Sequence, residues 1–380
     1  MKKIIPAVIL TVILIFSFSA CSGVTGPTSE PADTDIDTET EPAPETADTS
    51  GPDETDRVTE TSAEVTVTGE PAEVIRTPAE NDVTPPFFIV LNSKIRTVRG
   101  VWFDIEKYFA FADDLDPDVE MTVEGSYNIN FAGSYPIRVI ISDHSGNSTS
   151  ANVTVEVLET APETQPPAQT DPEPRITFAE FTQKYKKDGT SVGIDVSKWQ
   201  GNIDFDKVAA AGCEFVIIRL GGYVDGCFTD TYFKSNIKKA KEAGLKVGIY
   251  WYSQENSPEL VMKNMDYLFY ELGGETLDLP IYFDWEDFTH FQNYKMSVRD
   301  LNNMFSAFCL EAESRGYRAG LYNSKYFLGL MWSEESKEKD LWLALYSDQM
   351  NYDGDVFMWQ QGIGRIDGIN GDVDVNVMYK

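Results

Sequence analysis

The feature that most constrains the fold is an alternation of short apolar strand patterns with amphipathic helical patterns, which runs from about residue 191 to the end of the chain. Alternating strand and helix units form parallel sheets, and a sheet of eight such strands can close into a barrel. The expected strands are 192–196, 215–220, 246–252, 280–284, 317–322, 341–346, 356–359 and 373–377.

The expected barrel is a shortened one. Helical patterns fill only the first gaps, and several of them end in glycine, as helix C-termini often do. The last three strands follow one another without room for full helices. We therefore predict an α/β fold with a (β/α)5β3 barrel of the TIM type within residues 177–380. The helical patterns cover 206–211, 230–243, 258–272, 298–315 and 325–331.

Residues 83–158 show a different pattern, with apolar and polar residues alternating between turn signals. This predicts antiparallel strands in a small all-β sandwich. The expected strands are 87–91, 127–131, 135–141 and 151–157. The stretch 125–157 resembles the immunoglobulin-like repeats of bacterial surface proteins, which implies a spacer or a weak adhesion module.

Two segments lack any strand or helix period. Residues 22–82 hold 17 Asp or Glu and two Arg, about half of the formal net charge of −31, and are rich in Thr and Pro. Such a segment cannot bury enough apolar surface to offset its ordering entropy. We predict a disordered acidic tether over 21–82 and a second linker over 159–176. The acidic balance also argues against nucleic acid as a partner.

Residues 1–20 are typical of a targeting segment, with Lys2 and Lys3 followed by a short apolar run. The run ends in Phe18-Ser19-Ala20-Cys21, which resembles the bacterial lipobox, although Leu is usual where Phe18 stands. The resemblance implies cleavage before Cys21 and lipid on its sulfur. The chain would then be anchored on the extracellular face of the bacterial membrane. An ordinary secretory signal followed by a chance cysteine is the alternative.

Acidic residues recur where the barrel strands are expected to reach the mouth: Asp195, Asp284, Glu286 and Asp374. Asp284 and Glu286 are two apart on a strand, so their side chains point to the same side. Repulsion and burial both raise a carboxyl pKa, as a general acid requires. We expect Glu286 to donate a proton to a glycosidic oxygen. Asp284 would stabilise the developing positive charge or orient an N-acetyl group of the substrate.

Three sequence segments together resemble the glycoside hydrolase family 25 muramidases, over about residues 192–379. They are GIDVSKWQG at 193–201, FDWED at 283–287 and the stretch from WQQ at 359 to DVDVN at 376. The resemblance implies cleavage of the β-1,4 bond between N-acetylmuramic acid and N-acetylglucosamine by a monomer, with retention of configuration and without metal or organic cofactor. It implies Glu286 as proton donor, Asp284 as its partner, and Asp195 and Asp374 as further cleft acids. The implied substrate-binding residues are Tyr250, Tyr252, Trp285, Tyr322, Trp359 and Gln360.

Alternatives remain at this point. The barrel can be a non-catalytic glycan-binding adhesin, or a chitinase-like enzyme with a similar acidic strand. Arg219 can neutralise a cleft acid or form an ordinary ion pair, and Trp199 can be a packing residue at the rim. Cys213 and Cys227 can pair or remain thiols, and no zinc site is expected.

Overall fold

The computed structural model describes residues 81–161 and 175–379. The predicted signal peptide, Cys21, nearly all of the predicted tether and most of the predicted linker lie outside these residues. Among the helices of the described ranges, none is both long and apolar enough to cross a membrane.

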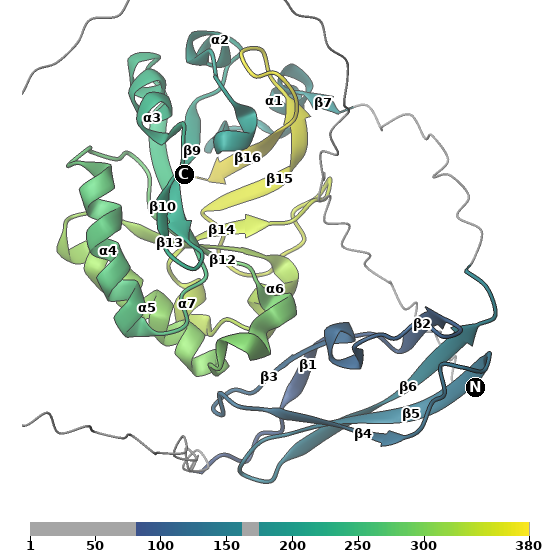
Figure 1. The fold of residues 1–380 in the computed structure, drawn as a ribbon. Helices are drawn as coiled ribbons and strands as arrows, with labels where there is room; N and C mark the ends of the chain where they lie inside the picture. The colour runs from purple at the N-terminus through teal and green to yellow at the C-terminus, as the bar shows by residue number, and fades with distance from the viewer. Residues whose placement is uncertain (1–80, 162–174, 380) are drawn as a thin grey trace, which may run out of the picture. The chain divides into compact units, whose positions relative to one another are not determined.

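Residues 87–158 form two β-sheets (Figure 1). The smaller sheet pairs β1 (Phe87–Leu91) with β3 (Phe109–Ala112), and a short 3-10 helix, η1 (Ile105–Tyr108), precedes β3. The larger sheet has the order β2 (Lys94–Val98), β6 (Ser148–Leu158), β5 (Gly133–Ser142) and β4 (Glu120–Gly125). Side chains from both sheets share one apolar core, which includes Phe109, Val139 and Val155.

One strand predicted in this region is wrong. Residues 127–131 form a turn, and the strand lies earlier, at β4. The Asn128 side chain accepts a hydrogen bond from the backbone N–H of Asn130, and its carbonyl accepts one from Phe131. Asparagine favours such local bonds over a sheet ladder. In addition, β2 and β6 are parallel, whereas only antiparallel pairs were expected.

Residues 190–379 contain a closed barrel of eight strands, which confirms the predicted (β/α)5β3 architecture. Its strands are β8 (Thr190–Val196), β9 (Phe215–Tyr223), β11 (Lys246–Ser253), β12 (Ile281–Trp285), β13 (Ala319–Ser324), β14 (Asp340–Ala344), β15 (Met358–Arg365) and β16 (Val373–Tyr379). Neighbours from β8 to β15 run parallel. The last strand, β16, is antiparallel to both β15 and β8 and closes the barrel.

Helices fill the first five gaps of the barrel, as the sequence predicts, and three of them are short. They are α2 (Phe205–Ala210), α3 (Phe233–Glu242), α4 (Pro258–Leu272), α5 (Val298–Ser314), α6 (Lys325–Leu330) and α7 (Glu334–Lys337). The boundaries of α4 follow from local chemistry: Ser257 caps its first turn, Pro258 begins it, and Gly273 ends it with a positive φ of 66°.

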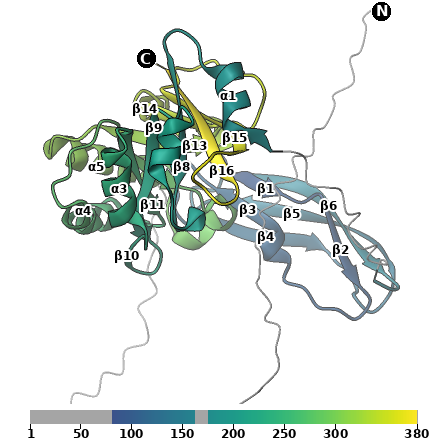
Figure 2. The ribbon, with the colours of Figure 1, turned by 90° about the horizontal axis from the view of Figure 1, so that it is seen from above.

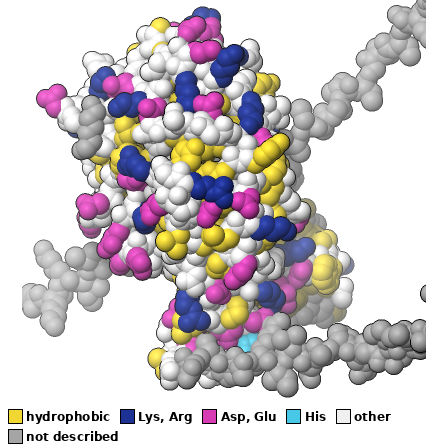
Figure 3. Space-filling view, turned by 90° about the vertical axis from the view of Figure 1, so that its left-hand side faces the viewer, with side chains coloured by type: hydrophobic (Ala, Val, Ile, Leu, Met, Phe, Trp, Pro, Cys, Tyr) yellow, Lys and Arg dark blue, Asp and Glu magenta, His cyan; other side chains and the backbone are white. Residues whose placement is uncertain are grey.

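Smaller elements complete the barrel. A strand β7 (Ile176–Thr177) pairs with β15, and the helix α1 (Phe178–Tyr185) follows it beside β15 and β16 (Figure 2). The strand β10 (Cys227–Thr229) extends β9 as a hairpin, and the 3-10 helices η2 (Lys198–Gln200) and η3 (Phe288–Tyr294) follow β8 and β12. On the face shown in Figure 3, acidic and basic side chains are interspersed around a central group of hydrophobic ones.

Candidate active site

The four acidic residues singled out in the sequence lie in one cavity of about 210 Å³. Asp195 lies in β8, Asp284 in β12, Glu286 just after β12, and Asp374 in β16. Carboxyl groups from three strands and one strand end thus meet at the mouth of the barrel. The other lining residues are Val196, Ser197, Trp199, Gln200, Arg219, Tyr250 and Tyr252.

The direction of β16 explains how Asp374 reaches this cavity. The parallel strands deliver their C-terminal ends to the mouth, but β16 is antiparallel and begins there. Its second residue, Asp374, is therefore the partner of Asp195 in the β16–β8 ladder. This corrects the expectation that all four acids lie at the C-terminal ends of strands.

Two amide side chains hold Asp195 in place. Gln360 Nε2 and Asn376 Nδ2 both donate to its Oδ2, at 3.0 and 2.8 Å. Tyr322 donates to the Gln360 amide oxygen and Trp342 to that of Asn376, so both amide groups turn their N–H toward the acid. Burial, and then the charge of Asp374, raises the pKa of Asp195 to about 8.

Asp374 is held by one donor. The Tyr346 hydroxyl donates to Asp374 Oδ1 at 2.7 Å, and burial raises the pKa of the carboxyl above its ordinary value. Since Asp195 and Asp374 lie opposite each other in adjacent strands, their carboxyl groups cannot both ionise readily. Such a pair disfavours ionisation of the neighbouring carboxyl groups.

Asp284 and Glu286 form a coupled pair with different exposure. Asp284 is buried, and its Oδ1 has no hydrogen-bond partner in the described structure, whereas Glu286 is exposed at the mouth. Burial, and then the charge of Glu286, raises the pKa of Asp284 well above its ordinary value. Burial also raises the pKa of Glu286, to about 7, although water reaches its carboxyl group from the mouth. At neutral pH the pair therefore retains a proton.

Arg219 is a basic side chain in the wall of this cavity. Its guanidinium group donates to Asp230 Oδ2 from Nε at 2.8 Å, and Asp230 also accepts the backbone N–H of Lys198. Both of the alternatives for Arg219 hold in part: it forms an ion pair with Asp230, and its charge also lowers the pKa of Asp284.

Aromatic side chains lie beside the acids. Trp199 is 77% exposed at the cavity, with Lys198 Nζ 4.8 Å from its ring centroid. Tyr250 and Tyr252 line the wall, as the resemblance implies. A flat exposed indole next to carboxyl groups is suited to stack on a sugar ring.

Three of the expected substrate-binding aromatics lie elsewhere. Trp285 is fully buried: it donates to the backbone carbonyl of Glu255 and packs against Phe288. Side chains alternate along β12, so a residue between Asp284 and Glu286 points away from the cavity. Trp359 is also buried and donates to the carbonyl of Leu345.

The third aromatic, Tyr322, lies beneath the cavity and holds the Gln360 amide group. Its ring packs on Trp342 with centroids 4.5 Å apart. Gln360 is buried and contacts Asp195. Tyr322 and Gln360 are thus positioned to support an acid.

Sequence reasoning missed Asn376, Trp342 and Tyr346. Asn376 lies two residues beyond Asp374 on the same strand face, a spacing that could have identified it. Trp342 and Tyr346 carry no local signal, because only barrel closure brings them to the acids. Of the described cysteines, Cys213, Cys227 and Cys309 are all free thiols, which resolves the open question of a Cys213–Cys227 pair.

Comparison with known proteins gives a family match over most of the barrel. Residues 194–364 match the family described as glycosyl hydrolases family 25. The autolytic lysozyme of Clostridium acetobutylicum is 27% identical over 187 residues, which cover 48% of this chain and 54% of that protein. The chain thus spans about half the length of that relative.

Two further matches each cover about half of the chain. The uncharacterized protein YegX of Escherichia coli O157:H7 is 29% identical over 194 residues, 49% of this chain and 68% of that protein. The spore cortex lytic enzyme SleM of Clostridium perfringens superimposes with a TM-score of 0.45 at 20% identity, covering 51% of this chain and 68% of that one. The family match by itself shows that residues 194–364 of the barrel carry the sequence pattern of glycosyl hydrolases family 25.

Proposed function

We propose that the barrel is a peptidoglycan hydrolase of the N-acetylmuramidase type. It cleaves the β-1,4 bond between N-acetylmuramic acid and N-acetylglucosamine. The family match and the similarity to an autolytic lysozyme support the glycoside hydrolase class. The observation that carries the proposal is the meeting of four carboxyl groups and an exposed tryptophan in one cavity.

In the proposed reaction, Glu286 is the general acid. It is the member of the Asp284–Glu286 pair that reaches the mouth, where a glycosidic oxygen can approach. A carboxyl group whose pKa is raised holds its proton at neutral pH and can transfer it to the leaving oxygen. The proton comes from Glu286, and breaking the C–O bond leaves the sugar with oxocarbenium-like charge.

Asp284 has two possible tasks in this scheme. It either stabilises the positive charge on the sugar, directly or through a covalent bond, or orients the N-acetyl oxygen of the substrate to attack the anomeric carbon. A covalent bond to Asp284, or attack by the N-acetyl oxygen, is followed by attack of water at the anomeric carbon, and these two displacements give retention of configuration. We propose retention: NMR of fresh product should show the β-anomer first, and initial release of the α-anomer would contradict both of these routes.

The reaction is tested by product analysis. The purified chain is incubated with peptidoglycan, and the new reducing ends are identified by mass spectrometry after borohydride reduction. Reducing ends at muramic acid are expected. Binding without release would instead support a glycan-binding adhesin, and cleavage of chitin alone would support a chitinase-like enzyme.

We also propose that the chain acts while anchored at the membrane through lipid on Cys21. The lipobox-like sequence supports this, and the acidic segment 22–82 would then separate the barrel from the membrane. Mass spectrometry of the mature N-terminus tests the anchor. Diacylglycerol on Cys21 is expected, and an unmodified chain released to the medium would exclude it.

A further inference from the structure

A second group of buried acids lies far from the barrel cavity in sequence, at one end of the two-sheet region. Asp82 precedes β1, Asp113 follows β3, and Asp143 follows β5. Carboxylate oxygens of the three residues lie within 4.8 Å of one another. All three side chains are buried, Asp113 completely. Turns from three separate segments thus converge on one small volume.

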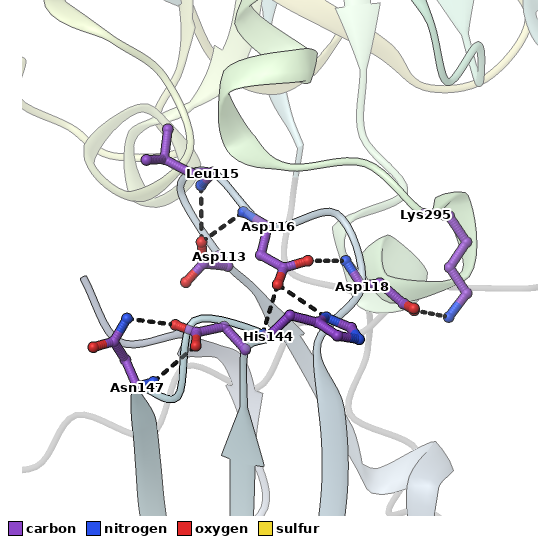
Figure 4. A network of polar contacts seen from close by, with 8 residues as sticks. Asp113, Leu115, Asp116, Asp118, His144, Asn147 and Lys295 are labelled. Atoms are coloured by element: carbon purple, nitrogen blue, oxygen red, sulfur yellow. Dashed lines mark hydrogen bonds and ion pairs between the residues drawn. The ribbon is translucent and has the colours of Figure 1, made fainter. Parts of the chain in front are cut away.

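The hydrogen bonds at Asp113 leave half of its carboxyl group without a partner. Its Oδ1 accepts the backbone N–H groups of Leu115 and Asp116, each at 2.8 Å. Its Oδ2 is buried and has no hydrogen-bond partner in the described structure. Figure 4 shows this second oxygen turned away from both N–H groups. A buried carboxylate oxygen without a donor costs free energy unless a cation or a proton satisfies it.

Asp82 repeats this arrangement. Its Oδ1 accepts the backbone N–H of Thr84 at 3.0 Å, while its Oδ2 is buried and without a partner. Asp143 is oriented by Asn147, which donates to Oδ1 from the backbone and to Oδ2 from its side chain. The Asn147 amide also donates to the backbone carbonyl of Asp82 at 3.4 Å, which ties two of the three segments together.

The Lys and His side chains drawn in Figure 4 interact with acids outside this group. Lys295 pairs with Asp118, and His144 contacts Asp116. Within residues 81–161 and 175–379, no Lys or Arg forms an ion pair with Asp82, Asp113 or Asp143. Burial, and to a smaller extent the charges of Asp82 and Asp114, raises the pKa of Asp113 to about 6. Three acids therefore share a buried volume without a basic partner.

The barrel shows how this chain satisfies a buried carboxylate without a cation. Glu255 is fully buried, and its carboxyl group accepts hydrogen bonds from Trp251, Ser253 and Asn264. Both of its oxygens have side-chain donors. Asp82 and Asp113 have only backbone donors, each on one oxygen, and their other oxygens are buried without a donor. The difference indicates a missing positive partner.

We propose that Asp82, Asp113 and Asp143 bind one Ca²⁺ ion. The available ligand atoms are oxygens, which Ca²⁺ prefers at roughly 2.3–2.6 Å, so oxygens on opposite sides of the ion are roughly 5 Å apart. Mg²⁺ requires a tighter octahedron with ligands at roughly 2.0–2.1 Å. Extracellular modules bind Ca²⁺ with dissociation constants of about 0.1–1 mM, which suits a surface-exposed protein.

Bound Ca²⁺ would link the segment that precedes β1, at Asp82, to the ends of β3 and β5. Because the ion binds only the folded arrangement, it raises the melting temperature in proportion to the logarithm of its concentration above the dissociation constant. The site would thus make the two-sheet region more stable outside the cell, where Ca²⁺ is abundant.

The test is calorimetric titration of the chelator-treated full chain with CaCl₂, together with thermal unfolding in EDTA and in 10 mM Ca²⁺. We expect one saturable site and a rise of several degrees in Tm. In Asp113→Asn the amide oxygen can keep both backbone hydrogen bonds, so the variant should fold. Its Tm in EDTA should equal or exceed that of the native chain and should not respond to Ca²⁺.

The matched control is Glu120→Gln, which changes an exposed acid on β4 and should keep the full response. Three outcomes overturn the proposal. They are no saturable Ca²⁺ binding by the native chain, an undiminished response of Asp113→Asn, and an equal response to Mg²⁺ at the same concentration.

Discussion

The barrel and the two-sheet region each bury a group of carboxyl groups, yet their surroundings differ. In the barrel, Asp195 and Asp374 receive hydrogen bonds from amide and phenol groups, and the cavity opens beside an exposed indole. In the two-sheet region, Asp82 and Asp113 each keep one oxygen without a partner in a closed volume. Buried acids alone therefore do not indicate catalysis.

What separates the two groups is access, because the barrel group also contains a buried carboxylate oxygen without a partner, Oδ1 of Asp284. The open cavity leaves Glu286 accessible, while two amide groups fix Asp195 and the Tyr346 hydroxyl fixes Asp374. The second group is buried and offers only oxygen atoms as ligands, which suits an ion. Glu286 and Asp113 both have a raised pKa, so the pKa shift shows burial and does not distinguish a proton donor from a metal ligand.

The largest expected effect separates the two groups directly. Glu286→Gln removes the proposed proton donor and should lower kcat by about 10²–10⁴-fold. The same variant should keep the full Ca²⁺-dependent rise in Tm, because the ion site shares no residue with the cavity. Hydrolysis of peptidoglycan and thermal unfolding measure the two effects. An unchanged kcat would show that Glu286 is not the proton donor. The matched control is Glu259→Gln, on the exposed face of α4.

A smaller effect is expected on kcat/KM when the pH is raised. The proposed donor must carry its proton, and the pKa of Glu286 is raised to about 7. The active form is therefore present below this pH and is lost above it. We expect kcat/KM to fall by about tenfold per pH unit above about pH 7. A rate that increases through pH 7 would show that the ionised carboxylate is the active form, as in a general base.

The smallest expected effect concerns Trp199, the exposed indole beside the acids of the barrel cavity. Trp199→Ala should raise KM by about three- to tenfold, since ring contacts of this kind contribute about 0.5–1.5 kcal/mol. The free energy of unfolding should change little, because the side chain is 77% exposed. Kinetics on peptidoglycan fragments and urea unfolding measure both quantities. An unaltered KM would mean that sugars do not contact this side of the mouth.

Much of the barrel was predictable because its signals are local. All eight strands and all five predicted helices are present, with boundaries shifted by a few residues. The helices end at Gly212, Gly244, Gly273 and Gly316 with positive φ, as expected. The two-sheet region was predicted less well, since a turn built on Asn128 replaces an expected strand.

The residues around the acids were harder to predict. Trp285 and Trp199 each lie in a motif that also holds a cavity acid, but one is fully buried and the other is exposed at the cavity. The position of Trp285 follows from strand alternation, a local rule that the family resemblance obscured. Trp199 follows a strand end, where no periodicity fixes the side-chain direction.

The sequence by itself determined the alternation of strands and helices and the identity of the four cavity acids, because both depend on patterns within a few residues. Tertiary structure decided the antiparallel direction of β16, which delivers Asp374 to Asp195, and the meeting of Asp82, Asp113 and Asp143. These arrangements depend on pairing and closure between segments far apart in the chain. Local periodicity carries no information about such contacts.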